Sequence, residues 1–156
     1  MAASPKIVLF LCTGNYYRSR YAEALFNAAA SRRGLPWRAE SRGLALERGV
    51  ANVGPLSADV VARLRSLGLL GDEPLRHPLP VDRHDLRRAA QVIALKEAEH
   101  RPLVEERFPG WARRVQFWHV HDIDGWSVEQ TLAAIDREVE ALVARLAQNG
   151  RTGDAN

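Results

Sequence analysis

The residues with the clearest chemical potential lie in one short segment, CTGNYYRS, at positions 12–19. Cys12 is the only cysteine of the chain, and Arg18 and Ser19 close the segment. A thiol beside a cation at the N-terminus of a helix ionises readily and becomes a nucleophile. The planar guanidinium of an arginine can bind two oxygens of a phosphate at once. The segment therefore predicts a thiolate nucleophile, Cys12, facing an oxyanion that Arg18 holds.

The other residues of this segment suit a loop that wraps around an anion. Gly14 gives the backbone room to turn, Asn15 tolerates a left-handed conformation, and Ser19 can donate a hydrogen bond toward the sulfur. The nucleotide-binding form of such a loop ends in Gly-Lys-Ser or Gly-Lys-Thr, so we expect a phosphate-like dianion rather than a nucleotide. The residues expected to bind it are Thr13, Gly14, Asn15, Tyr16, Tyr17 and Ser19.

A strand before the segment and a helix after it are expected to position these residues. Residues 6–11, KIVLFL, form an apolar run without alternation, which is typical of a strand buried on both faces of a parallel sheet. Residues 19–33 are rich in helix formers, and Gly34 ends that helix. Parallel sheets bind ligands beyond the carboxyl ends of their strands, and Cys12 falls at such an end.

Strand and helix patterns alternate along the rest of the chain. The further predicted strands are at 37–41, 91–95 and 115–120, and the further predicted helices are at 57–67, 82–89, 96–108 and from Ser127 onward. Ser57 is expected to cap the first of these helices, and Gln130 follows Ser127 at capping-box spacing. Pro102 is expected at the start of its helix or at a kink. The alternation predicts an α/β fold with a parallel sheet and helices on both faces. We expect one domain over residues 1–150 and a disordered tail at 151–156.

Composition and charge exclude several other classes of protein. The chain has 156 residues, of which 46% are hydrophobic and 26% charged, with a net charge of +3; this is ordinary for a globular domain. No apolar run approaches the ~20 residues of a membrane span, no secretory signal opens the chain, and no basic block or nucleic-acid-binding motif occurs. A single cysteine permits neither an internal disulfide nor a multi-cysteine zinc site. We therefore expect a cytoplasmic protein that binds neither nucleic acid nor membrane.

Residues 12–19 resemble the signature of the low-molecular-weight protein tyrosine phosphatases, which reads Cys, any residue, Gly, Asn, two variable residues, Arg, Ser. Further similar segments are 41–43, where Ser41 matches the family's serine that bonds the loop asparagine, 89–100, which matches a family strand, and 118–122, which matches the stretch ending in the family's catalytic Asp-Pro. The resemblance implies a three-layer sandwich whose four-stranded parallel sheet has helices on both faces. It identifies the chain as a bacterial-type member with an atypical acid loop.

The mechanism that this resemblance implies has two in-line steps and needs no metal or other cofactor. Cys12 attacks phosphorus and forms a phosphocysteine while Arg18 binds the phosphoryl oxygens. Asp122 protonates the leaving oxygen and then activates the water that frees phosphate. The implied substrate is a phosphorylated protein or a small aryl phosphate, and the expected enzyme is a monomer or a weak homodimer.

The acid loop departs from the family pattern. The family has Asp-Pro where this chain reads DIDG at 122–125. Counting from Trp118 favours Asp122 as the general acid, and Asp124 is the competitor because the missing proline leaves the loop less fixed.

The aromatic residues near the predicted site also depart from that pattern. Tyr17 stands where many members carry a second cysteine that protects the nucleophile as a reversible disulfide, so an oxidised Cys12 would need an outside thiol. Tyr16 and Trp126 are expected to form the walls of the substrate mouth instead of the family's usual aromatics.

Two alternatives to a phosphatase stay open on the sequence alone. An arsenate reductase-like enzyme uses a similar anion loop, and here it would have to draw on an external thiol because the chain has no further cysteine. A non-catalytic phosphate- or oxyanion-binding module would need Arg18 and the loop, but neither Cys12 nor an acid.

Overall fold

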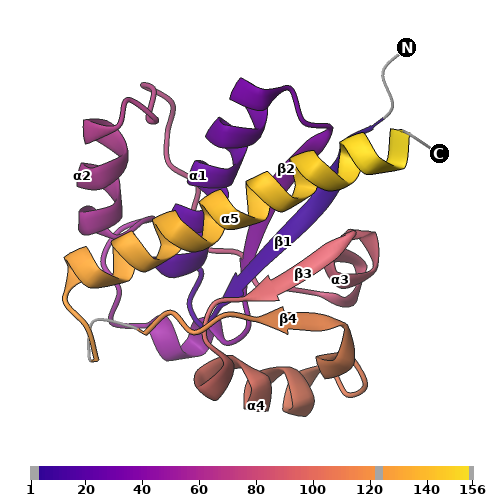
Figure 1. The fold of residues 1–156 in the computed structure, drawn as a ribbon. Helices are drawn as coiled ribbons and strands as arrows, with labels where there is room; N and C mark the ends of the chain where they lie inside the picture. Colours follow the sequence, from indigo (N-terminus) through magenta and orange to yellow (C-terminus); the bar gives the residue numbers. More distant parts are fainter. Residues whose placement is uncertain (1–3, 122–124, 155–156) are drawn as a thin grey trace.

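Within residues 4–121 and 125–154, which the computed structural model describes, four parallel strands form one sheet in the order β2-β1-β3-β4 (Figure 1). The strands are β1 (Lys6–Cys12), β2 (Trp37–Gly43), β3 (Gln91–Ala94) and β4 (Val115–Phe117). The four-stranded parallel sheet predicted from the sequence is confirmed. Because all four strands are parallel, their carboxyl ends meet at one edge of the sheet, and Cys12 lies at that edge.

Helices cover both faces of the sheet. The helical elements are α1 (Arg18–Arg33), η1 (Leu46–Gly49), α2 (Ala58–Ser66), α3 (Arg83–Arg88), α4 (Glu97–Arg107), η2 (Ala112–Arg114) and α5 (Val128–Asp154). Figure 1 shows α5 lying alongside α1 over one face, with α3 and α4 on the other. The predicted three-layer arrangement is therefore confirmed. In the described part of the chain, no helix is both long enough and apolar enough to cross a membrane.

Strand β1 is buried on both faces, and this explains its unbroken apolar sequence. Successive side chains of a strand point to opposite faces. Val8 and Phe10 belong to the hydrophobic cluster under α1, α2 and α5. Leu9 and Leu11 belong to the cluster under α3 and α4. The strand that delivers Cys12 is thus held from both sides by close-packed side chains.

Helix ends follow the sequence prediction at some positions and differ at others. Ser127 and Gln130 form the predicted capping box, with reciprocal bonds of 2.9 Å and 3.1 Å. The predicted side-chain cap at Ser57 is wrong: its hydroxyl makes no cap bond, and its own N–H donates to the Tyr16 carbonyl at 3.1 Å, which ties the start of α2 to the loop. Pro102 lies inside α4 rather than at its start.

The C-terminal helix is longer than the sequence suggested. We expected residues 151–156 to form a disordered tail, but α5 continues as far as Asp154. Ala155 and Asn156 lie outside the described residues.

Candidate active site

The predicted nucleophile and its serine lie together at the junction of β1 and α1. Cys12 is the last residue of β1 and is 3% exposed. Its Sγ lies 2.9 Å from Ser19 Oγ, in the first turn of α1. Either atom can be the donor when the sulfur is a thiol, and the serine hydroxyl must donate when the sulfur is a thiolate. The structure therefore has the Ser19–sulfur contact that the sequence predicted.

Asn15 holds the loop in shape through its side chain and its backbone. Its φ of +51° is the left-handed conformation that the sequence predicted. The amide Nδ2 donates to Ser19 Oγ at 2.9 Å and to Ser41 Oγ at 3.0 Å. The amide oxygen accepts from the Leu79 N–H at 3.0 Å and from Arg76 at 2.9 Å. A fully buried amide with all these bonds satisfied fixes the loop before any ligand arrives.

Two arginines that were not among the predicted site residues reinforce this loop. Arg76 donates to Ser41 Oγ at 2.9 Å as well as to Asn15. Arg20 donates to the carbonyls of Asn15 at 3.2 Å, Pro55 at 3.1 Å and Arg76 at 2.6 Å. Burial, together with the charge of Arg76, lowers the pKa of Arg20 to about 10. An arginine in the first turn of a helix opposes the helix dipole, and this position is the sequence signal that could have pointed to Arg20.

Arg18 is held at both ends of its guanidinium. The side chain is nearly buried, its Nη1 donates to the Val120 carbonyl at 3.3 Å, and its Nη2 forms an ion pair of 2.7 Å with Glu99 Oε2. The Thr13 hydroxyl donates to the same carboxylate oxygen. Glu99 was not predicted, because it lies in the first turn of α4, more than eighty positions away in sequence. The arginine of the loop therefore has an acidic partner from another element.

A hollow opens above the loop and contains most of the predicted site residues. Its lining includes Cys12, Thr13, Gly14, Tyr16, Tyr17 and Arg18, together with Arg48, Asn52, Asp59 and Glu99 from neighbouring segments. The Tyr16 hydroxyl donates to the Val53 carbonyl, which holds that ring at the mouth. Trp126 is not among the described residues that line this hollow: its ring forms a T-shaped pair with the His121 ring, 4.6 Å between centroids, and packs against the core. The structure therefore places Tyr16 at the mouth; Tyr17 borders the hollow and, like Trp126, packs against the core.

The predicted acids, Asp122 and Asp124, lie outside the described residues. The chain just before them is anchored at two points. The Val120 carbonyl accepts from Arg18, and the His121 carbonyl accepts from Thr131 Oγ1 at 3.0 Å. The segment that leads into the acid loop thus runs beside the loop arginine.

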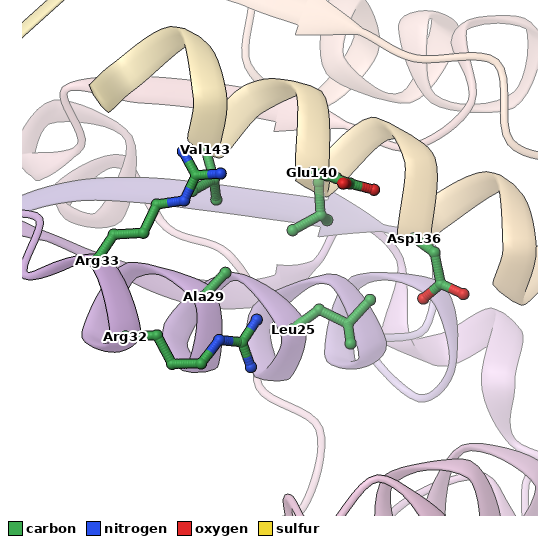
Figure 2. A pocket seen from close by; sticks show the side chains of 8 residues that line it. Leu25, Ala29, Arg32, Arg33, Asp136, Glu140 and Val143 are labelled. Atoms are coloured by element: carbon green, nitrogen blue, oxygen red, sulfur yellow. The ribbon is translucent and has the colours of Figure 1, made fainter. Parts of the chain in front are cut away.

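A second hollow lies between α1 and α5, where Figure 2 shows side chains of the two helices facing one another. It is lined by Leu25, Ala29, Arg32 and Arg33 of α1 and by Asp136, Val139, Glu140 and Val143 of α5. None of these described lining residues is a cysteine, serine or histidine. The hollow above Cys12 is therefore the candidate active site.

Sheet, loop and buried arginine together define an enzyme that carries out phosphate chemistry on a cysteine nucleophile. Comparison with known families agrees: the family described as low molecular weight phosphotyrosine protein phosphatase matches residues 7–152. The chain belongs to this family and is a cysteine-dependent phosphatase, in keeping with the resemblance noted in the sequence. This membership favours the phosphatase over the arsenate reductase-like and non-catalytic alternatives.

Solved structures of similar proteins cover nearly the whole chain. A low molecular weight protein tyrosine phosphatase from T. tengcongensis is 27% identical, with 92% of this chain and 99% of that chain covered and a TM-score of 0.69. YfkJ from Bacillus subtilis is 25% identical, with coverages of 94% and 98% and a TM-score of 0.77. The YwlE arginine phosphatase from Geobacillus stearothermophilus is 26% identical, with coverages of 97% and 96% and a TM-score of 0.68. A comparison with curated protein sequences gave no match.

Proposed function

We propose that this phosphatase hydrolyses phosphotyrosine in proteins, or small aryl phosphates, with Cys12 as the nucleophile. The observation that carries the proposal is the position of the Cys12 sulfur, 2.9 Å from the Ser19 hydroxyl and in the same hollow as Arg18. A thiolate at the N-terminal end of a helix can attack a phosphorus atom that the loop N–H groups hold in place.

The first half of the reaction transfers the phosphoryl group to the enzyme. The Cys12 thiolate attacks phosphorus, an S–P bond forms, and the bond from phosphorus to the leaving oxygen breaks. Arg18 and the backbone N–H groups of the loop bind the equatorial oxygens, on which charge builds up. Asp122 gives its proton to the leaving oxygen, so that a neutral phenol departs.

The second half releases phosphate from the phosphocysteine. A water molecule attacks phosphorus, gives its proton to the Asp122 carboxylate, and the S–P bond breaks with its electron pair returning to sulfur. Ser19 stabilises the departing thiolate by donating its hydroxyl hydrogen, since Sγ and Oγ are 2.9 Å apart. The two half-reactions together consume only the phosphate ester and one water molecule, and they regenerate the Cys12 thiolate and the protonated Asp122.

We assign the general acid to Asp122 rather than Asp124. Asp122 is two residues from Val120, whose carbonyl accepts from Arg18 at 3.3 Å, and two residues span at most about 7 Å of chain. Asp124 is four residues from the same anchor. The shorter tether supports the assignment of Asp122.

The Tyr16 ring at the mouth supports an aromatic substrate. Tyr16 lines the hollow, and contacts between aromatic rings are favourable beyond their simple burial of area. One similar solved structure is an arginine phosphatase, so phosphoarginine is the competitor that the substrate assay must include. We also propose that the enzyme acts in the cytoplasm as a monomer or weak homodimer; a lone thiol nucleophile is suited to a reducing compartment.

The decisive experiment measures phosphate release from para-nitrophenyl phosphate with a metal chelator present. We expect the wild type to be active and Cys12→Ser to lose at least about 10³-fold in rate. A phosphotyrosine peptide and a phosphoarginine peptide of the same sequence then compete in the same assay. An inactive wild type across acidic to neutral pH refutes the phosphatase proposal, and preference for the phosphoarginine peptide refutes the aryl substrate.

The acid is tested by comparing Asp122→Asn with Asp124→Asn on esters with good and poor leaving groups. Loss of a general acid lowers the rate by about 10²–10⁴, and the loss is greatest when the leaving alcohol most needs a proton. We expect this pattern for Asp122→Asn on phenyl phosphate, with a smaller loss on para-nitrophenyl phosphate. If Asp124→Asn shows the pattern instead, the assignment is wrong.

A further inference from the structure

Glu99 places a carboxylate beside the phosphate-binding arginine, and three different side chains hold it there. Its Oε2 lies 2.7 Å from Arg18 Nη2 and 3.1 Å from His100 Nε2, and it also accepts from the Thr13 hydroxyl. The residue lies in the first turn of α4, where the helix dipole favours a negative charge. A side chain fixed by three partners at the edge of the active-site hollow has a role beyond surface charge.

Glu99 is a fixed anion rather than a proton donor. Burial by itself would raise the pKa of Glu99, but the hydrogen bonds from His100, Arg18 and Thr13 and the charge of Arg18 hold it well below the usual range for glutamate. This lowered pKa favours the charged carboxylate at the acidic to neutral pH of the phosphatase assay, so Glu99 is not suited to replace the aspartates of the acid loop as the general acid.

His100 supports Glu99 as a neutral donor. Its Nδ1 accepts from the Lys96 N–H at 3.0 Å, so the ring proton is on Nε2. That Nε2 faces Glu99 Oε2 at 3.1 Å and Thr13 Oγ1 at 3.2 Å. The ring is fully buried, and this burial lowers the pKa of His100, which keeps the ring neutral. The backbone of α4 thus sets the direction of the proton that holds the carboxylate.

Glu99 lines the hollow and bonds to the side chains of Arg18 and Thr13. Among the described residues, the hydrogen bonds to Glu99 come from side chains, and none comes from a backbone N–H of residues 13–18. Those backbone groups are the ones expected to hold a phosphate. Glu99 and the Val120 carbonyl each take one end of the Arg18 guanidinium, and two anchored nitrogens fix the plane of a rigid fork.

We propose that Glu99 is a positioning residue for the phosphatase reaction, which sets the plane of the Arg18 guanidinium before the substrate binds. The proposal rests on the proposed function, because it assumes that Arg18 stabilises the charge on the transferring phosphoryl group. A preset arginine helps the transition state more than the ground state. Removing the charge of Glu99 should therefore slow catalysis without weakening the binding of a simple phosphate.

The test is Glu99→Gln, which keeps the shape of the side chain and removes its charge. We expect kcat on para-nitrophenyl phosphate to fall about tenfold, or 1.4 kcal/mol, while the inhibition constant of inorganic phosphate stays the same or decreases. Orthovanadate, which takes on the five-coordinate geometry of the transition state, should bind about tenfold more weakly. Melting temperatures of both proteins show whether folding is affected.

Glu97→Gln is the matched control. Glu97 lies on the same helix, and its carboxylate pairs with Arg101 at 2.6 Å instead of with the loop. We expect wild-type kinetics and wild-type vanadate affinity from this variant. A loss as large as that of Glu99→Gln would mean that any charge change on α4 has the effect, and this would overturn the proposal.

Two results with Glu99→Gln also overturn it. If kcat/KM rises and phosphate binds more tightly, the carboxylate competes with substrate and does not position Arg18. If kcat, phosphate affinity and melting temperature all fall together, Glu99 is only structural. Thr13→Val and Thr13→Ser supply a second route should Glu99→Gln fail to fold: Val removes the hydroxyl that holds Glu99 and should reproduce the selective loss, and Ser should restore activity.

The experiment separates this proposal from the proposed function. If the wild type does not hydrolyse aryl phosphates, the proposed function fails on that result alone. Binding of vanadate and phosphate, measured by calorimetry, then still tests Glu99, because the selective loss of vanadate affinity does not depend on turnover.

Discussion

Gly43 offers the sharpest test of how tightly the loop of residues 13–18 is packed against the sheet. It is the last residue of β2 and pairs in register with Cys12. A Cβ added there would lie 2.6 Å from Leu46 Cδ2 and 2.9 Å from the Thr13 carbonyl oxygen. The second contact is with the backbone of the loop, and that oxygen is itself bonded to the Ala45 N–H at 2.9 Å. The loop must therefore shift to accept Gly43→Ala.

The expected cost follows from this overlap. Overpacking a closed site costs about 1–3 kcal/mol, and each kcal/mol lowers the melting temperature of a domain of this size by roughly 2–4 °C. Taking about 2 kcal/mol, we expect Gly43→Ala to melt about 4–8 °C below the wild type. The displaced Thr13 follows Cys12 directly, so kcat on para-nitrophenyl phosphate should fall by about tenfold or more.

Gly71→Ala is the matched control for this experiment. A Cβ at Gly71 would meet nothing within 4 Å, so we expect a melting temperature and a kcat close to those of the wild type. Differential scanning fluorimetry and steady-state kinetics on the three proteins provide both readouts. If Gly43→Ala has the same melting temperature as Gly71→Ala and keeps its kcat, the loop has room for a methyl group beside β2 and the packing argument is refuted.

Two further predictions concern the groups that support the loop and the core. Arg76→Met removes a charged donor 2.9 Å from Asn15 Oδ1, so urea unfolding should show a loss of about 2 kcal/mol and kcat should fall; an equal result for the exposed Arg65→Met would contradict this. Burial and the hydrogen bond to Asp136 raise the pKa of Tyr21 to about 12, above its value of about 10 in an unfolded chain. This stabilisation is present below pH 10 and is lost as the pH rises toward 12. The stability advantage of wild type over Tyr21→Phe should therefore stay constant up to about pH 10 and shrink as the pH rises from there to about 12, and a constant difference across that range would refute it.

The strand, loop and helix that carry the nucleophile could be predicted because each is specified by neighbouring residues. The apolar run before Cys12 predicted a strand buried on both faces, and in the structure its side chains belong to a hydrophobic cluster on each face of the sheet. Gly34 ends α1 with φ +64°, a conformation that glycine adopts without strain. Asn15 has the left-handed backbone that its residue type permits. Such features depend on contacts within a few positions of the chain, so the sequence alone carries them.

Predictions that depended on packing between elements were less successful. The Ser57 hydroxyl could have capped α2, but its backbone N–H is bonded to the loop at Tyr16, and the side chain makes no cap bond. Trp126 was expected at the substrate mouth, and its ring packs instead against His121 and the core. A local pattern cannot tell a capping or wall residue from a packing residue when the choice depends on a distant neighbour.

Spacing and backbone preference act over short distances, so the sequence was enough to predict that Cys12, Arg18 and Ser19 lie close together between a buried strand and a helix. Which charged side chains contact this segment depends on how distant elements pack together. Glu99 reaches Arg18 from α4, and Arg76 reaches Asn15 from a connector without regular structure. Both are ordinary surface residue types in the sequence. Glu99 reaches the site because parallel strands bring their carboxyl ends, and the segments that follow them, to the same edge of the sheet. Arg76 reaches it because its connector, between α2 and α3, is bonded to the end of β2 through the Gly43 N–H and the Leu79 carbonyl at 2.8 Å.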